Sequence, residues 1–243
     1  MGLAIIDADE IVPARVPATG VNRRLSARVR PAAAQRQQSA GEKIASSASH
    51  GLALLAAVVG IPFLYGASAR PKSASMVGPS VFALTMVAVY LSSTIYHALP
   101  CGRSKHLFLK VDRSAIYLFI AGSYTPFALG VLAGPWGWSI FAAIWSLAAL
   151  GVTLTVYDRL SGAWPSTALY LVMGWLVLVA AAPLIELTPA RSIFLLVAGG
   201  ISYTAGVAFF VFDSRLPYAH AIWHVFVIGG TACHYFAVLN CTT

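Results

Sequence analysis

Seven stretches of mostly apolar residues constrain the fold of this 243-residue chain more than any other feature. Each is about 20 residues long, and a helix of that length crosses the roughly 30 Å of hydrocarbon in a bilayer. The runs lack the alternation of polar and apolar residues that a transmembrane strand shows. Charged residues make up only 10% of the chain, against about a quarter in soluble domains. The sequence therefore predicts an all-α polytopic membrane protein, a bundle of seven transmembrane helices.

The predicted spans are separated by short loops that contain turn-forming or helix-breaking residues. They cover residues 44–66, 78–99, 115–133, 136–157, 164–185, 192–212 and 219–239. No loop is long enough to hold a soluble module, so the chemistry must lie within the bundle. We therefore expect residues 41–243 to form a single transmembrane domain.

Residues 1–40 have a different composition. Six arginines are spread here among alanine, proline, glutamine and serine, at Arg15, Arg23, Arg24, Arg28, Arg30 and Arg36. Its scattered apolar residues cannot form a core, and it lacks the continuous apolar run found in a secretory signal. We expect a disordered basic arm that is not cleaved. A second interpretation is that its arginines contact anionic lipid headgroups at the cytoplasmic leaflet.

The distribution of basic residues predicts the orientation in the membrane, because positively charged loops stay in the cytoplasm. With the N-terminus inside, 13 of the 16 lysines and arginines fall on the cytoplasmic side. Only Arg70, Lys72 and Arg191 fall outside. An odd number of spans places the termini on opposite sides, so we predict a cytoplasmic N-terminus and an external C-terminus. The expected location is the bacterial inner (plasma) membrane.

Five polar residues from three predicted spans reach the same depth in this topology. His97 ends the second span, Asp112 begins the third, and His220 and His224 begin the seventh; Ser93 lies one turn before His97. Residues four apart lie on one helical face, so His220 and His224 can share a ligand. Polar residues inside a membrane are costly and mark functional sites.

Three histidines with one carboxylate nearby indicate a metal site. Catalytic zinc sites keep three protein ligands and an open fourth position, so we predict Zn²⁺ bound by His97, His220 and His224. Zinc lowers the pKa of a bound water towards neutrality. Asp112 is the candidate to orient that water or take its proton, and Ser93 is the candidate to bind the water or a developing oxyanion.

Each of these residues also has a purely structural interpretation. The histidines can donate hydrogen bonds to neighbouring carbonyls. Asp112 can pair with Arg113 or Lys110 at the interface, and Ser93 can bond back to a carbonyl one turn earlier.

Several other residues are weaker candidates. Cys101 follows His97 closely, but Pro100 breaks the helix between them. His50 begins the first span at a compatible depth and is expected to line the cavity without touching metal. His234 lies roughly 15 Å further along its helix than His224, and His106 is expected to be solvated. The three cysteines are expected to form no disulfide.

Three motifs in order resemble the bacterial hemolysin III proteins. They are SSTIYH at 92–97, DRSAIY leading to AGSYTPF at 112–127, and YAHAIWH at 218–224. These proteins belong with the progestin and adipoQ receptors and, more distantly, with alkaline ceramidases. The resemblance covers about residues 42–239 and implies a seven-helix bundle with a cytoplasm-facing zinc. It implies that His97, His220 and His224 hold the metal, that Asp112 reaches it through water, and that Ser93 lies beside the first ligand. The N-terminal arm departs from the compact bacterial pattern.

Three functions of different class follow as hypotheses. The first is a zinc-dependent, ceramidase-like hydrolase that cleaves a membrane lipid amide or ester from the cytoplasmic side. The second is a pore-forming hemolysin, which the family name implies. The outer halves of the spans carry almost no charge, so a pore ranks lower. The third is a sensor of membrane state or a receptor with a structural zinc. Membrane lipid is the expected partner, nucleic acid is not, and the sequence leaves the oligomeric state open.

Overall fold

The computed structural model describes residues 38–68, 76–160 and 163–242. All regular secondary structure in these residues is helical, and seven helices are long and apolar enough to cross a membrane. The elements are α1 (Ala40–Ser68), α2 (Val77–Ala98), α3 (Arg103–Pro126), η1 (Phe127–Leu132), α4 (Gly134–Val156), α5 (Ala163–Trp175), η2 (Leu176–Ala180), α6 (Ala181–Leu187), α7 (Ala190–Val211) and α8 (Ala219–Thr242). The predicted all-helical, seven-span fold is confirmed. Most of the predicted N-terminal arm, residues 1–37, lies outside the described residues.

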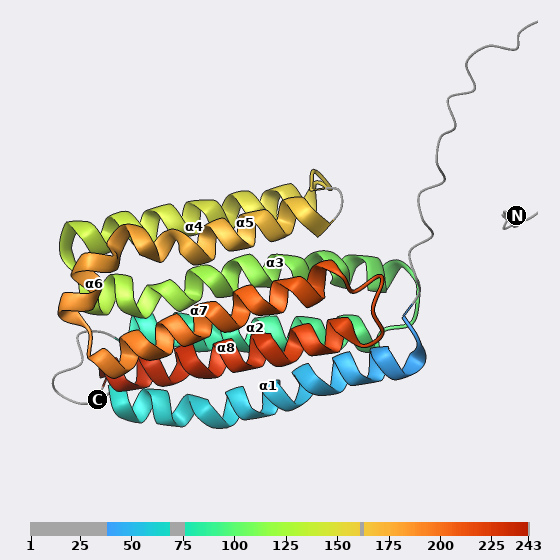
Figure 1. Ribbon diagram of the computed structural model, residues 1–243, viewed down its shortest axis with the longest axis horizontal. Coiled ribbons are helices and arrows are strands. Elements are labelled where there is room, and N and C mark those ends of the chain that lie inside the picture. Colours follow the sequence, from blue (N-terminus) through green and yellow to red (C-terminus); the bar gives the residue numbers. More distant parts are fainter. Residues whose placement is uncertain (1–37, 69–75, 161–162, 243) are drawn as a thin grey trace, which may run out of the picture. The chain divides into compact units, whose positions relative to one another are not determined.

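The helices run side by side along one direction (Figure 1). The most extensive contacts join α7 to α8, α2 to α3, α1 to α2, α3 to α4, and α1 to α8. α8 is therefore flanked by α1 and α7, and α2 connects this group to α3. The first turns of α1, α3 and α8 lie at the same end of the bundle as the last turn of α2 (Figure 1).

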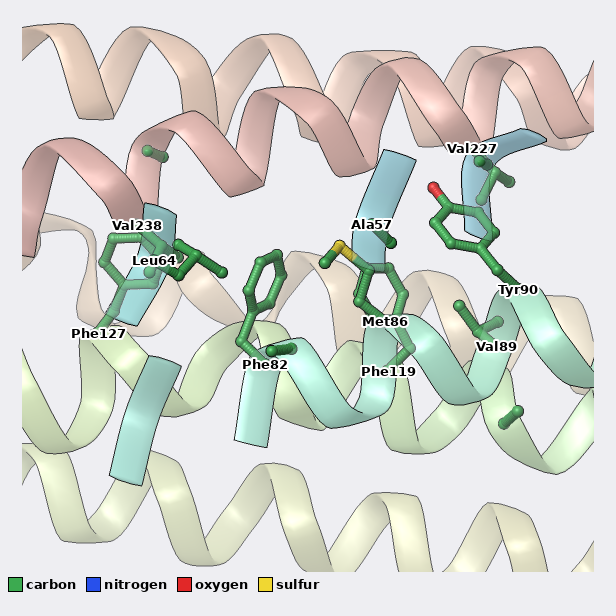
Figure 2. Close-up of a cluster of buried hydrophobic side chains, with 14 of the residues drawn as sticks. Ala57, Leu64, Phe82, Met86, Val89, Tyr90, Phe119, Phe127, Val227 and Val238 are labelled. Atoms are coloured by element: carbon green, nitrogen blue, oxygen red, sulfur yellow. The ribbon is translucent and has the colours of Figure 1, made fainter. Parts of the chain in front are cut away.

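Apolar side chains from four helices fill the centre of the bundle. Phe82 and Met86 of α2 are at most 2% exposed, and they pack in one cluster with Leu64 of α1, Phe119 of α3 and Val238 of α8. Figure 2 shows this cluster between the ribbons. In a membrane the hydrophobic effect does not drive apolar helix surfaces together, because lipid tails are equally apolar. Close van der Waals packing therefore holds these helices together.

Side chains satisfy the helix ends near the histidines. The Ser39 hydroxyl accepts a hydrogen bond from the Glu42 amide at 3.2 Å, and the Glu42 carboxylate accepts one from the Ser39 amide at 2.8 Å. This reciprocal pair is a capping box and explains why α1 begins here. At the end of α2, the Lys105 ammonium donates to the carbonyls of Tyr96 and Leu99 at 3.1 and 3.0 Å. A cation at a helix C-terminus is favourable for the helix dipole.

The third helix starts well before its predicted position. It begins at Arg103 rather than at residue 115, so Asp112 lies within the helix and not at its start. Residues 103–114 mix cations with Leu107, Phe108 and Val111. Such an amphipathic segment extends a helix beyond the hydrocarbon, where a search for continuous apolar residues does not follow it.

The fifth span is interrupted rather than continuous. α5 ends at Trp175, a 3₁₀ segment covers Leu176–Ala180, and α6 follows. Pro183 has no amide proton to donate to the preceding turn, which disfavours an unbroken α-helix here. The Tyr124 hydroxyl donates to the carbonyls of Met173 and Gly174 and accepts from the Val177 amide, all at 2.8 Å. It thereby replaces backbone hydrogen bonds that the irregular segment loses.

Two adjacent glycines of α7 provide a test of the α7–α8 packing. A Cβ at Gly199 would lie 2.5 Å from the His234 ring and 3.1 Å from the Gly230 carbonyl oxygen, whereas a Cβ at Gly200 would meet nothing within 4 Å. Gly199→Ala should therefore lower the free energy of unfolding in detergent by about 1–3 kcal/mol. The matched control Gly200→Ala should be neutral or raise it by up to about 1 kcal/mol. Equal stability of the two variants would contradict this packing.

The orientation in the membrane stays a prediction that labelling can test. Cys101 is exposed between α2 and α3, which a cytoplasmic N-terminus places inside the cell. An impermeant maleimide should label it only after permeabilisation, with Cys101→Ser as the control. Alkaline phosphatase fused after Thr243 should be active, because the C-terminus is expected outside. Labelling of Cys101 in intact cells would reverse the orientation.

Candidate metal centre

Three histidines from two helices converge at one end of the bundle. His97 lies in the last turn of α2, and His220 and His224 lie in the first two turns of α8. Their potential ligand nitrogens all lie within 4.8 Å of one another. The ring centroids are 4.8 Å apart for His97 and His220, 5.1 Å for His97 and His224, and 4.8 Å for His220 and His224. The three predicted ligands are therefore positioned to bind one metal ion.

A backbone carbonyl of α1 orients His224. Its Nδ1 lies 3.1 Å from the Ser46 carbonyl oxygen and 3.0 Å from the Ser49 hydroxyl. A carbonyl oxygen only accepts, so Nδ1 carries the proton and donates it. Nε2 then keeps its lone pair, the state that a metal ligand requires. His224 is only 1% exposed, so this hydrogen bond also offsets the cost of burying the ring.

A carboxylate orients His220 in the same way. Its Nδ1 lies 3.1 Å from Asp213 Oδ2, in the connection between α7 and α8. An ionised carboxylate accepts a hydrogen bond, which protonates Nδ1 and leaves Nε2 available. A carboxylate or carbonyl partner behind each metal-binding imidazole is the usual arrangement in metal sites.

The start of α8 is fixed to α1 by a buried carboxylate. Glu42 is 4% exposed, and its Oε1 accepts a hydrogen bond from the Tyr218 amide at 2.8 Å. Tyr218 has a φ of 57°, a left-handed conformation that a tyrosine rarely adopts. Glu42 thus stabilises an unfavourable turn that comes two residues before His220.

The donor set fits a zinc ion. The Nε2 atom of His97 is buried and has no hydrogen-bond partner among the described residues. Imidazole nitrogens suit zinc, and a tetrahedral zinc at about 2.0–2.1 Å from each nitrogen separates its ligand nitrogens by roughly 3.3 Å. Binding would bring the three nitrogens, which lie within 4.8 Å of one another, closer together. Imidazole also suits iron, copper and nickel, so the donor set alone does not select the metal.

Asp112 and Ser93 face each other beside this cluster. Ser93 of α2 is 2% exposed, and its hydroxyl lies within hydrogen-bonding reach of the Asp112 carboxylate on α3. Of the two alternative partners of Asp112, Lys110 pairs with Asp158 instead, whereas Arg113 does interact electrostatically with the Asp112 carboxylate. The hydrogen bond back to a carbonyl of the preceding turn, considered above for Ser93, is formed by Ser92. Its hydroxyl donates to the Val89 carbonyl at 3.1 Å.

A fourth histidine lies against the cluster without sharing its geometry. His50 of α1 is 4% exposed and stacks on His224 with a centroid distance of 3.5 Å and an angle of 10° between the rings. The lone pairs of an imidazole lie in its ring plane. A metal in the plane of His224 is therefore about 3.5 Å out of the plane of His50, too far for a bond of about 2 Å. His50 lines the site, as expected, and is not a ligand of the same ion.

The other candidates lie away from the cluster. His234 packs against Tyr203 of α7 at 5.3 Å between ring centroids. Cys101 is exposed beyond the end of α2, and His106 is exposed on α3. The three cysteines are free, as predicted.

Sequence reasoning missed the partners of the histidines. Asp213 was placed only in a loop, seven residues before His220, and no local pattern connects the two positions. The Ser46 carbonyl is a backbone group and leaves no trace in the residue type. Nothing in the sequence around Glu42 indicates its contact with the Tyr218 amide, 176 residues away.

A seven-helix membrane bundle with a buried three-histidine cluster at one end defines an integral, multi-pass membrane protein with a candidate metal centre. The family model described as Haemolysin-III related matches residues 40–235. The chain belongs to the hemolysin III family, within the progestin and adipoQ receptor superfamily.

Similarity to individual relatives extends over most of the chain. The chain is 41% identical over 199 residues to Hemolysin-3 of Bacillus cereus, and the alignment covers 82% of this chain and 90% of that protein. It is 39% identical over 199 residues to the Hemolysin-3 homolog of Bacillus subtilis, covering 82% and 93%. The human monocyte to macrophage differentiation factor is 30% identical over 209 residues, covering 81% and 83%. No solved structure matches the chain significantly. The bacterial relatives are consistent with a plasma-membrane location.

The Asp213–His220 hydrogen bond makes a testable prediction. Asp213→Ala should weaken metal binding about 10–100-fold, because loss of such a partner frees the imidazole to rotate and to take the wrong tautomer. Competition with a chromophoric zinc chelator on the purified chain measures the affinity. Ser214→Ala, one residue away, is the matched control and should bind as the unmodified protein does. An unchanged affinity in Asp213→Ala would show that this carboxylate does not orient His220.

Proposed function

We propose that this protein is an intramembrane zinc-dependent hydrolase that cleaves an amide or ester bond of a membrane lipid from the cytoplasmic side. One observation carries the proposal. The three imidazoles of His97, His220 and His224 converge within 4.8 Å while Ser46 and Asp213 hold the opposite ring nitrogens of two of them. A hydrogen-bonding role alone does not require this convergence.

The residues beside the histidines have the chemistry that hydrolysis needs. A zinc ion held by the three nitrogens would supply Lewis-acid polarisation of a carbonyl and an activated water. The Asp112 carboxylate is the group to accept a proton from the attacking water and to orient it. The Ser93 hydroxyl lies beside that carboxylate, where it can help to orient it towards the site. The surrounding helices exclude bulk water, which strengthens each electrostatic contact.

The position of the site favours a lipid substrate. It lies at one end of helices whose outward faces carry exposed apolar residues such as Leu52, Leu84 and Val225, as expected for surfaces in contact with lipid. The amide or ester bond of a membrane lipid lies near the ends of transmembrane helices, at the boundary between hydrocarbon and headgroups. A soluble substrate would have to enter a buried site from water.

A pore is the main competing function, because the relative from Bacillus cereus carries the name Hemolysin-3. The apolar cluster of Leu64, Phe82, Met86, Phe119 and Val238 fills the middle of the bundle, and an aqueous path needs polar groups along the full thickness. The packing therefore disfavours a channel through a single subunit. A membrane-state sensor with a structural metal is the third possibility, and the Asp112 variant below separates it from a hydrolase.

Two variants test the metal and the chemistry separately. The purified protein should contain about one zinc per chain by elemental analysis, and His220→Ala should lose most of it because a ligand is removed. Asp112→Asn should keep the metal but lose hydrolysis of short-chain ceramides and lipid esters about 10²–10⁴-fold, the usual contribution of a general base. His106→Ala, an exposed position, is the matched control for histidine removal.

The possible outcomes differ for each function. A metal-free wild-type protein would contradict the metal centre itself. If the protein holds stoichiometric zinc but cleaves no lipid amide or ester, the hydrolase is contradicted. The sensor is then favoured, provided that Asp112→Asn leaves the cellular phenotype unchanged. Conductance in defined bilayers that is insensitive to chelators would favour the pore.

A further inference from the structure

A second polar site lies where α3 meets the end of α4 and the first turn of α5. It is a cavity of about 110 Å³, on a different face of α3 from Asp112, which points towards Ser93 of α2. Its polar lining is His106, Lys110, Arg113, Thr155, Asp158 and Ser166. None of these residues takes part in the metal centre.

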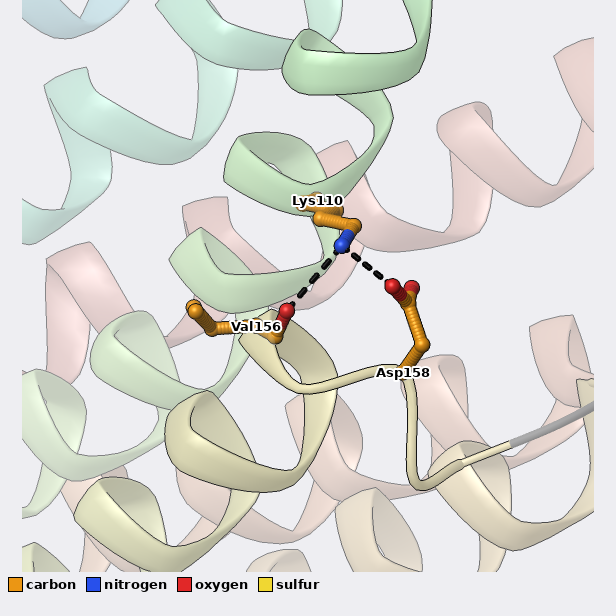
Figure 3. A network of polar contacts seen from close by, with 3 residues as sticks. All are labelled: Lys110, Val156 and Asp158. Atoms are coloured by element: carbon orange, nitrogen blue, oxygen red, sulfur yellow. Dashed lines mark hydrogen bonds and ion pairs between the residues drawn. The ribbon is translucent and has the colours of Figure 1, made fainter.

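The lining is positively charged once its one carboxylate is paired. The Lys110 ammonium donates to Asp158 Oδ2 at 2.5 Å and to the Val156 carbonyl at 3.0 Å (Figure 3). This hydrogen bond lowers the pKa of the Asp158 carboxyl, so the pair stays ionised at neutral pH. Asp158 is thus neutralised by Lys110. The Arg113 guanidinium makes no ion pair with any residue that the structure describes. It interacts electrostatically with Asp112, its neighbour in sequence, but no carboxylate in the cavity wall is left to neutralise it.

A buried hydroxyl adds a second donor to the same cavity. Ser166 is 4% exposed, and its Oγ has no hydrogen-bond partner among the described residues. The Tyr117 hydroxyl lies nearby, but the geometry does not form a hydrogen bond and that oxygen is also left without a partner. Most buried side-chain polar atoms in folded proteins are paired. An unpaired hydroxyl beside a guanidinium that no carboxylate in the cavity wall neutralises therefore indicates a ligand that accepts hydrogen bonds.

The backbone at the start of α5 also favours a negatively charged ligand. Ser166 lies in the first turn of α5, the 13-residue helix Ala163–Trp175, whose leading amides have no partner within the helix. The dipole of a helix favours a negative charge at this end, which is why anions bind there. Trp164 in the same turn is 66% exposed, consistent with the depth of lipid headgroups, where tryptophan is enriched.

Size and charge select the ligand. One water occupies about 30 Å³ in the liquid, so a cavity of about 110 Å³ has room for between three and four waters, close to the size of a single phosphate group. The planar fork of an arginine matches the oxygens of a phosphate. We propose that this cavity binds a phosphate group, with the Arg113 guanidinium and the Ser166 hydroxyl as its principal donors. The group is carried either by a phospholipid headgroup or by free phosphate.

The test uses the full-length protein purified in phosphate-free detergent. Calorimetric titration with inorganic phosphate, and capture of phosphatidate from phosphatidylcholine nanodiscs, distinguish the two sources. Arg113→Gln should weaken binding about tenfold or more, because it removes a charged donor, and Ser166→Ala should weaken it several-fold. Arg103→Gln is the matched control: it removes the same charge from an exposed position on the same helix, outside the cavity. Binding should also weaken as the ionic strength rises.

Each result has a defined meaning. Binding of both probes, or of either alone, supports the site if it depends on Arg113 and Ser166 but not on Arg103, and the probe that binds identifies the source. Absence of binding, or binding that Arg113→Gln leaves unchanged, overturns the proposal. Helical circular dichroism and a monodisperse gel-filtration peak of the same samples serve as the folding control, because neither depends on bound metal. Failure here is thus distinguishable from failure of the metal centre.

Discussion

Imidazole rings buried among apolar helices need a partner for each nitrogen, because an unmatched polar atom in hydrocarbon is costly. The rest of the candidate site depends on how this requirement is met. The Ser46 carbonyl and the Asp213 carboxylate each take one nitrogen of an α8 histidine, which turns the other nitrogens towards His97. The contact between α1 and α8 is therefore both a packing interface and the device that orients a candidate ligand.

The same interface explains why the start of α8 is held so firmly. Glu42 closes the capping box of α1 and also binds the Tyr218 amide. One carboxylate thus caps the N-terminus of α1 and also positions the start of α8, 176 residues away in the chain. The stacked His50 fills the space above His224, so α1 shapes the site although it contributes no predicted ligand.

α3 carries two consecutive charged residues that face different parts of the bundle. Asp112 points towards α2 and the histidine cluster, and Arg113, the next residue along the helix, lines the cavity between α4 and α5. Consecutive residues on a helix are about 100° apart, so neighbouring positions serve different faces. The proposed phosphate site and the candidate metal centre therefore share a helix without sharing a residue.

The sequence by itself determined the seven spans, the common depth of the five polar residues, and the family. These depend on the lengths of apolar runs and on spacing along single helices, which local physics controls. Only the tertiary structure decided which groups accept hydrogen bonds from the Nδ1 atoms of His220 and His224, and that His50 stacks on His224 instead of joining the candidate ligands. It also decided that Lys110, and not Arg113, pairs with Asp158. Each of these depends on contacts between helices distant in the chain, and the third helix begins early because charged residues carry it past the hydrocarbon. Packing chooses among such partners, and no spacing within one helix encodes that choice.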